Sequence, residues 1–385
     1  MNEIVRTFYL LAALQGILLS AVLLTKKANH AANRVLALAT LALSLELIAQ
    51  VYYFSGWYRQ FPSAMGITYP FPFLYGPLFY LYARLVSKAT LRLRWADALH
   101  FLPALFVFAS ILHVFFYTDA EKIAFVDRMI MEVQEPLYDV IEGGIPVQGI
   151  IYTILTIRIV AAYNRRIRNS FSTIEAINLA WLKYVTLGMI IIWSLVVVLF
   201  FLDLFLPFEA GWDALIHIPI GILIYVIGYK GLRQPEIFLD SSVPGQDLSQ
   251  GNKYERSGLS DSDADDIRER LLILMKEERL YLDQTLTLQK LARRLDVTCH
   301  NLSEVINSRL HQSYYDFVNA HRVEEFKSRL ADPANAPLNL LSIAFDSGFS
   351  SKGTFNAIFK KLAGMTPSEY KTQMAPGPGG IRTGT

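Results

Sequence analysis

Two rows of polar residues near the carboxyl end repeat at the spacing of one helix face. The first row consists of His300, Ser303, Glu304 and Asn307. The second consists of Lys352, Gly353, Asn356 and Lys360, with Ser351 and Lys361 beside it. Residues three and four apart are neighbours on a helix. Imidazole, amide, hydroxyl and ammonium groups in such rows suit hydrogen bonding to base edges and phosphates. The alternative is an ordinary solvated helix face.

An internal repeat precedes each row and would position it. The two copies are "LARRLDVT" at 291–298 and "IAFDSGFS" at 343–350. Each copy has an alanine where two helices approach, then a turn residue that tolerates positive φ, then a hydroxyl that caps the next helix. These residues are Ala292, Asp296 and Thr298 in the first copy, and Ala344, Gly348 and Ser350 in the second. The pattern predicts two helix-turn-helix units and favours the nucleic-acid interpretation of both rows.

Apolar residues opposite the rows predict the buried faces of the same helices. They are Leu302, Val305, Ile306 and Leu310 in the first unit, and Phe355, Ile358, Phe359 and Leu362 in the second. Between the units, "SYYDFVNAHRVEEFKSRL" at 313–330 predicts a long amphipathic helix that acts as a strut. "DADDIRERLLILMKEERLYLD" at 263–283 predicts another amphipathic helix before them.

Residues 286–370 closely resemble the AraC/XylS-type DNA-binding domain. The motifs are "LTLQKLARRLDVTCHNLSEVINSRL", "YYDFVNAHRVEEFKSRL" and "IAFDSGFSSKGTFNAIFKKLAGMTPSEY". The resemblance implies base-reading positions at His300, Ser303, Glu304, Lys352, Gly353, Asn356 and Ala357. Gly353 and Ala357 are shorter than the side chains often found there, so the second unit is expected to grip phosphate through its lysines and Ser351. Glu304 would repel phosphate unless it accepts from a cytosine amino group.

The first 230 residues are rich in apolar runs near the 20 residues that a helix needs to cross a bilayer. We predict seven spans, at 4–25, 35–54, 67–87, 96–117, 145–163, 182–206 and 212–229. Around the prolines at 70–77, a kinked third span and a late start to a plain helix are equally favoured. The fold class is therefore all-α, with a seven-helix transmembrane bundle followed by a domain of two helix-turn-helix units joined by a long helix.

Basic residues predict the orientation of these spans, because short cytoplasmic loops retain Lys and Arg. They follow the first, third, fifth and seventh spans, as in Lys26, Lys27, Arg165, Arg166 and Arg168, whereas the loop 118–144 is mainly acidic. The N-terminus is expected outside a bacterial inner membrane and the C-terminal domain in the cytoplasm. The apolar half also resembles that of bacterial membrane-anchored relatives, but less closely than residues 286–370 resemble the DNA-binding domain.

Three polar residues within the spans form a candidate intramembrane signal site: Glu46, His113 and His217. A charged group in lipid is costly, so it faces the bundle interior and marks either function or a contact between helices. The contact between helices is the better supported alternative from the residues alone.

Composition limits the remaining classes. The single cysteine excludes a disulfide framework and a cysteine-rich metal site, and no catalytic motif is found, so no cofactor, metal or enzyme activity is expected. The net charge of +2 says little about partners. We predict a membrane domain at 1–235, a flexible linker at 236–262, the DNA-binding domain at 263–374 and a disordered tail at 375–385.

The leading hypothesis is a one-component sensor that couples a membrane or extracytoplasmic signal to transcription. Its expected partners are double-stranded DNA, the lipid bilayer, an unknown signal ligand, a second copy of the chain in a homodimer, and RNA polymerase. The alternatives are a transporter or membrane enzyme with a regulatory tail, and a structural anchor that releases the DNA-binding domain by proteolysis.

Overall fold

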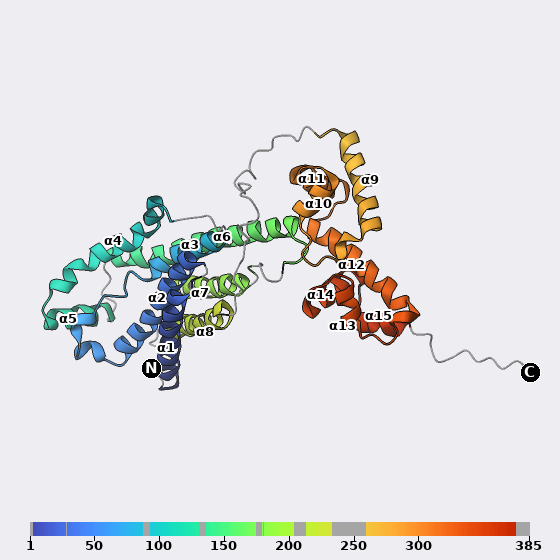
Figure 1. Cartoon of the computed structure of the whole chain (residues 1–385). Coiled ribbons are helices and arrows are strands. Elements are labelled where there is room, and N and C mark those ends of the chain that lie inside the picture. Colours follow the sequence, from blue (N-terminus) through green and yellow to red (C-terminus); the bar gives the residue numbers. More distant parts are fainter. Residues whose placement is uncertain are drawn as a thin grey trace, which may run out of the picture. The chain divides into compact units, whose positions relative to one another are not determined.

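The computed structural model describes residues 3–27, 29–87, 93–130, 136–174, 179, 181–203, 213–232 and 259–374. The expected tail, at 375–385, and most of the expected linker lie outside these residues. In the described ranges the chain forms α-helices and short 3-10 helices and no β-strand (Figure 1), which confirms the all-α prediction. The chain divides into two compact units, one of Met1–Tyr163 and Leu179–Leu239, the other of Asn164–Asn178 and Asp240–Thr385.

The first unit is built mainly from long apolar helices. Its elements are α1 (Glu3–Thr25), α2 (His30–Phe54), η1 (Trp57–Arg59), η2 (Pro62–Ala64), α3 (Pro72–Ser87), η3 (Trp95–Phe101), α4 (Leu102–Ile111), η4 (Leu112–Phe116), α5 (Asp119–Ile130), α6 (Pro136–Ser170), α7 (Leu182–Asp203) and α8 (Asp213–Leu232). Within the described ranges, six stretches are long and apolar enough to cross a membrane: Glu3–Thr25, His30–Phe54, Trp95–Phe116, Pro136–Ser170, Leu182–Leu202 and Ala214–Gly231.

The predicted third span is the exception, so the count of seven is approximate. Its helix, α3, begins only at Pro72 and has 16 residues. At 1.5 Å per residue it is about 24 Å long, shorter than the roughly 30 Å of a hydrocarbon core. Residues before it form turns, such as Phe71 N–H to the Thr68 carbonyl, because proline restricts the preceding residue and lacks an amide donor. The helix therefore starts late, and it contains Pro77.

Small residues let α1 approach α2 closely. The Ser20 hydroxyl lies 2.7 Å from the Thr40 hydroxyl and donates to the Ala37 carbonyl at 2.8 Å. A Cβ added to Gly16 would lie 2.0 Å from Ser44 Oγ. Small residues and hydroxyl hydrogen bonds are what hold apolar helices together where burial from water gives no driving force.

Helix α6 is much longer than the span predicted for it. It runs for 35 residues with Pro146 inside, whereas the prediction covered 145–163. Such a helix is about 52 Å long, more than the thickness of a hydrocarbon core. Its last residues, from Asn164 onward, belong to the second compact unit.

The second unit contains the carboxyl-terminal helices. They are α9 (Asp261–Glu278), η5 (Leu280–Leu282), α10 (Leu288–Leu295), α11 (Cys299–Arg309), α12 (Tyr314–Ala331), η6 (Pro333–Asn335), α13 (Leu340–Asp346), α14 (Lys352–Ala363) and α15 (Pro367–Met374). One hydrophobic core joins α9, α10, α11 and the start of α12, and another joins α13, α14 and the rest of α12. Phe317 of α12 lies in the first core and Phe326 in the second, so the predicted strut is confirmed.

Candidate nucleic-acid interface

The first helix-turn-helix comprises α10, a tight turn and α11. Asp296 ends α10 in the left-handed conformation, at φ 55° and ψ 48°, as predicted for this turn residue. The Val297 N–H then donates to the Ala292 carbonyl at 3.0 Å. Thr298 caps α11, because its hydroxyl accepts from the Asn301 N–H at 3.1 Å. These local bonds fix the direction in which α11 leaves the turn.

The second helix-turn-helix comprises α13, its turn and α14. Gly348 has a φ of +93°, and the Phe349 N–H donates to the Ala344 carbonyl at 3.2 Å, as in the first unit. The cap, however, is Ser351, which accepts from the Thr354 N–H at 3.2 Å. The prediction of Ser350 was wrong by one residue, because this turn takes one more residue than the first before its helix begins.

The buried faces of α11 and α14 follow the predicted stripes with one exception. Leu302, Val305 and Ile306 are buried in the first unit. Phe355, Ile358 and Phe359 are buried in the second. Leu362 was predicted inward but is 45% exposed. The helix ends at Ala363, and Ala363 and Tyr370 pack against the second core instead.

The opposite face of α11 presents the first row of polar residues to solvent. His300 and Asn307 are exposed, and Ser303 and Glu304 are half-buried. Asn307 Nδ2 donates to the Ser303 carbonyl at 2.7 Å, and His300 Nε2 lies 3.8 Å from Glu304 Oε2. The row therefore consists of two contacting pairs on one face of α11.

The exposed face of α14 carries the second row. Lys352, Gly353, Asn356 and Lys360 are all exposed. Ser351 is half-buried and its hydroxyl serves as the cap. Lys361 is exposed but its Nζ lies 2.9 Å from Asp316 Oδ1 on α12. Lys352, Asn356 and Lys360 thus present polar or charged side chains to solvent, while Ser351 and Lys361 are engaged within the domain.

The comparison with protein families decides what this arrangement is. Residues 291–373 match the family described as a helix-turn-helix domain, which is the region that holds both turns and both rows. These residues form an AraC-type helix-turn-helix domain. The match covers less than a quarter of the chain. Neither the curated proteins nor the solved structures gave a match.

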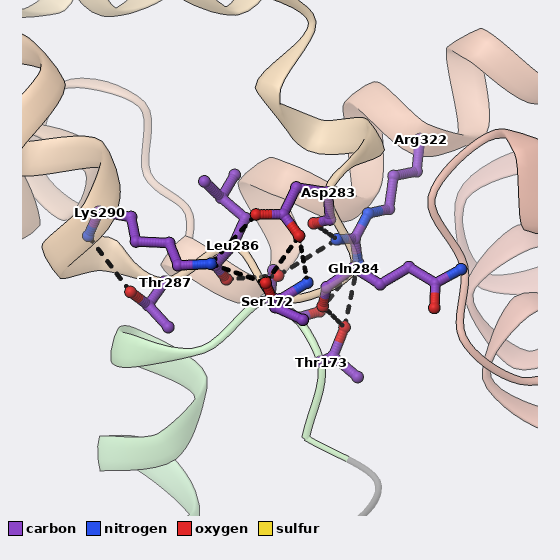
Figure 2. Close-up of polar contacts among 9 residues, drawn as sticks. Ser172, Thr173, Asp283, Gln284, Leu286, Thr287, Lys290 and Arg322 are labelled. Carbon is purple, nitrogen blue, oxygen red and sulfur yellow. Dashed lines mark hydrogen bonds and ion pairs between the residues drawn. The ribbon is translucent and has the colours of Figure 1, made fainter. Parts of the chain in front are cut away.

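The AraC-type domain has a buried arginine that the sequence analysis missed. Arg322 of α12 is 1% exposed, and its guanidinium donates to carbonyl groups. The Nε atom donates to the Tyr281 carbonyl at 2.8 Å, and Nη2 donates to the Asp283 carbonyl at 3.0 Å (Figure 2 shows the latter). A signal was present, because Tyr315, Asn319, Arg322 and Phe326 share one stripe of α12. Polar residues in a buried stripe indicate a hydrogen-bonded network.

The ring of His321 is stacked on Tyr281, with centroids 5.5 Å apart and planes at 12°. Burial lowers the pKa of His321, and the Glu324 carboxylate opposes this only in part. The unfolded chain therefore binds a proton near pH 6.5 that the folded domain does not. Folding stability is full above that pH and falls as the pH decreases through it, by at most about 1.4 kcal/mol per pH unit.

We expect the urea midpoint of the second compact unit to decrease as the pH is lowered from 7 to 5.5. His321→Gln is expected to remove the part of this decrease that His321 causes. Pulse proteolysis of the full chain in membranes measures the urea midpoint. Asp283 and Asp316 do not interfere, because both have a pKa below the usual value and titrate under more acidic conditions. An identical fall in His321→Gln would contradict the assignment.

The candidate intramembrane residues are only partly brought together. Glu46 Oε1 on α2 lies 3.7 Å from His217 Nε2 on α8 and accepts from Gln50 Nε2 at 3.1 Å. The side chains of Glu46 and His217 are 12% and 10% exposed. Glu46 Oε2 is buried without a hydrogen-bond partner among the described residues. His113 has ring contacts with Tyr117 and Phe125 instead.

The described part of the chain contains no group of three or more His, Cys, Asp or Glu side chains placed to hold a metal ion.

Proposed function

We propose that the chain is a membrane-embedded, sequence-specific transcriptional regulator and a one-component sensor. The observation that carries this proposal is the presence of six helices of membrane-spanning length and an AraC-type helix-turn-helix domain on one chain. The helix-turn-helix domain is a DNA-binding module and not an enzyme. Sensing is the role that explains why such a module is joined to a helical bundle of this size.

The proposed arrangement places the chain in the bacterial inner membrane, with the N-terminus outside and the DNA-binding domain in the cytoplasm. Basic residues at Lys26, Lys27 and Arg165 support it, as does the need of the domain for access to DNA. Residues 1–235 would bind the signal ligand, and Glu46 with His217 is the site that we favour. Double-stranded DNA, a second copy of the chain and RNA polymerase are the proposed macromolecular partners.

The outward rows are the proposed DNA contacts, with His300 and Asn307 on α11 and Lys352 and Asn356 on α14 as their most exposed members. Exposed side chains can be shortened with little effect on folding. A lost base contact costs about 1–3 kcal/mol, so replacing all four by alanine is expected to weaken specific binding by about 100-fold or more. Loss of the Lys352 phosphate contact should also reduce the salt dependence of binding.

Mapping of genomic sites bound by the full-length protein tests this function, followed by affinity measurements on the sites found. The matched control is Arg268→Ala with Lys276→Ala, which removes exposed charge from α9 at positions that belong to neither row. The proposal fails if the fourfold variant binds and regulates the mapped sites as the wild type does. It also fails if the control loses binding to the same extent.

A further inference from the structure

The segment 168–173, called here the docking segment, comprises the last three residues of α6 and the three that follow it, and it is bound into the second compact unit (Figure 2). Phe171 pairs with Thr287 in an isolated antiparallel bridge. The Ser172 hydroxyl donates to the Leu286 carbonyl at 2.7 Å, and Thr173 Oγ1 donates to the Gln284 carbonyl at 2.8 Å. Ser172 is 1% exposed, so it is an interior residue of this unit.

Arg322 binds the docking segment and the rest of the domain at the same time. Its Nη1 donates to the Ser172 carbonyl at 3.2 Å, and its Nη2 donates to the Ser172 hydroxyl at 3.2 Å. Asn319 Nδ2 also donates to the Ser172 carbonyl, at 3.3 Å. Buried donors of a charged group need acceptors, so the docking segment completes the guanidinium's hydrogen bonds.

The segment 281–287, between η5 and α10, connects this site to both helix-turn-helix units. Its last residue, Thr287, caps α10 of the first unit. Gln284 Nε2 donates at 3.0 Å to the Phe349 carbonyl, in the turn of the second unit. The docking segment therefore lies against a stretch of chain that contacts both helix-turn-helix units.

A second contact reaches the recognition helix α14 directly. Arg168 Nη2 lies 3.0 Å from Asp316 Oδ1, and Lys361 Nζ of α14 lies 2.9 Å from the same oxygen. Burial raises the pKa of Asp316, but the Ser313 hydrogen bond and the charges of Lys361 and Arg168 outweigh it and keep the carboxylate ionised. The guanidinium of Arg168 also lies over the Tyr315 ring, 5.0 Å from its centroid.

We propose that the docking segment is a clamp that holds both helix-turn-helix units in one DNA-binding arrangement, and that α6 is the route by which the membrane half alters it. This inference rests on the proposed function. A continuous helix conveys a shift or rotation along its whole length. Withdrawal of the segment leaves Arg322 and the carbonyls of Gln284 and Leu286 without these partners, and it loosens the contact of 281–287 with both helix-turn-helix units. An unfixed pair must then be ordered by DNA at an additional cost in free energy.

Two changes in the full-length protein in membranes test the clamp. Ser172→Ala with Thr173→Val removes the two hydroxyls that dock the segment. Insertion of two glycines between Ser170 and Phe171 interrupts its connection to α6. The matched controls are Thr372→Val, which removes one hydroxyl bonded to the Ser368 carbonyl on α15, and the same two glycines inserted between Gln250 and Gly251.

Hydrogen exchange measures docking, and occupancy of the mapped genomic sites measures DNA binding. In both test variants we expect exchange of the peptides spanning 168–174 and 281–287 to be at least about tenfold faster, because local opening costs less. Occupancy is expected to fall at least about fivefold at equal protein level, because the units are no longer preorganised. Both controls should stay within about twofold of the wild type.

The outcomes are separable from those of the proposed function. Faster exchange with unchanged or increased occupancy would overturn the clamp, and so would unchanged exchange in both test variants. An effect of the insertion at Gln250 equal to that at Ser170 would overturn α6 as the route. If the wild type binds no genomic site, both the proposed function and the proposed effect of α6 on DNA binding fail. Slow hydrogen exchange at Ser172 would still establish that the docking segment is bound.

Discussion

Replacement of Arg322 by methionine is expected to destabilise the second compact unit by several kcal/mol, because each buried carbonyl that loses its donor costs about 1–3 kcal/mol. Methionine fills the space but donates no hydrogen bond. The carbonyls of Tyr281, Asp283 and Ser172 would remain buried without this donor. Since a whole domain has only about 5–15 kcal/mol of stability, much of the unit should unfold at 37 °C.

Pulse proteolysis in urea on the full chain in membranes measures this loss through the yield of the protected carboxyl-terminal fragment. Arg268→Met is the matched control, because Arg268 is exposed on α9 and should change stability by less than about 0.5 kcal/mol. Arg322→Lys retains the charge without the planar fork of donors and should fall between the two. Equal stability of Arg322→Met and Arg268→Met would show that the network contributes nothing.

The second large effect is expected for Gly348→Ala in the turn before α14. A Cβ at this position would lie 2.4 Å from the Tyr281 carbonyl oxygen and 3.0 Å from Arg322 Nε. The residue also has a φ of +93°, which costs an L-residue about 1–2 kcal/mol. With the backbone clash added, we expect a total loss of about 3 kcal/mol or more. Occupancy of DNA should fall with it.

Gly364→Ala separates the two causes. Gly364 also has a positive φ, of 77°, but an added Cβ would meet nothing within 4 Å. Gly364→Ala is expected to lower the free energy of unfolding only by the cost of the positive φ, about 1 kcal/mol. The difference between the two variants, measured by the same urea titration, is the contribution of the close approach at Gly348. A difference near zero would mean that the 281–287 segment moves aside without loss.

In the second compact unit, the features that could be predicted from the sequence are those set by local chemistry. The turn residues Asp296 and Gly348, the Thr298 cap and the apolar stripes of α11 and α14 are set by residues a few positions apart, and the structure has them as expected. Ser350 and Leu362 were wrong because the two units differ in the length of one turn and in where the last helix ends. Neither the length of a turn nor the exact end of a helix changes the spacing of apolar residues, so the sequence pattern does not reveal them.

Long-range contacts explain what could not be predicted. The bond from Arg322 to Ser172 joins residues 150 positions apart, and nothing in "NSFST" indicates a buried segment. In the first compact unit, hydropathy located six helices of sufficient length, but it could not predict the start of α3 or the full extent of α6. Proximity of Glu46 to His217, without His113, likewise depends on how α2 and α8 pack. The role of the outward rows in DNA binding remains a prediction.

The buried position of Ser172 has a consequence for transplanting the domain. A graft that starts at residue 259 would carry Arg322 without Ser172 and Thr173, which lie far upstream in the chain. Chimeras built at that boundary should be poorly soluble and degraded, and supplying residues 164–174 as a fused segment should rescue them. An intracellular protease that cuts after α8 would release the same incomplete piece. Cleavage after α8 is therefore expected to inactivate the protein rather than to release a functional DNA-binding domain.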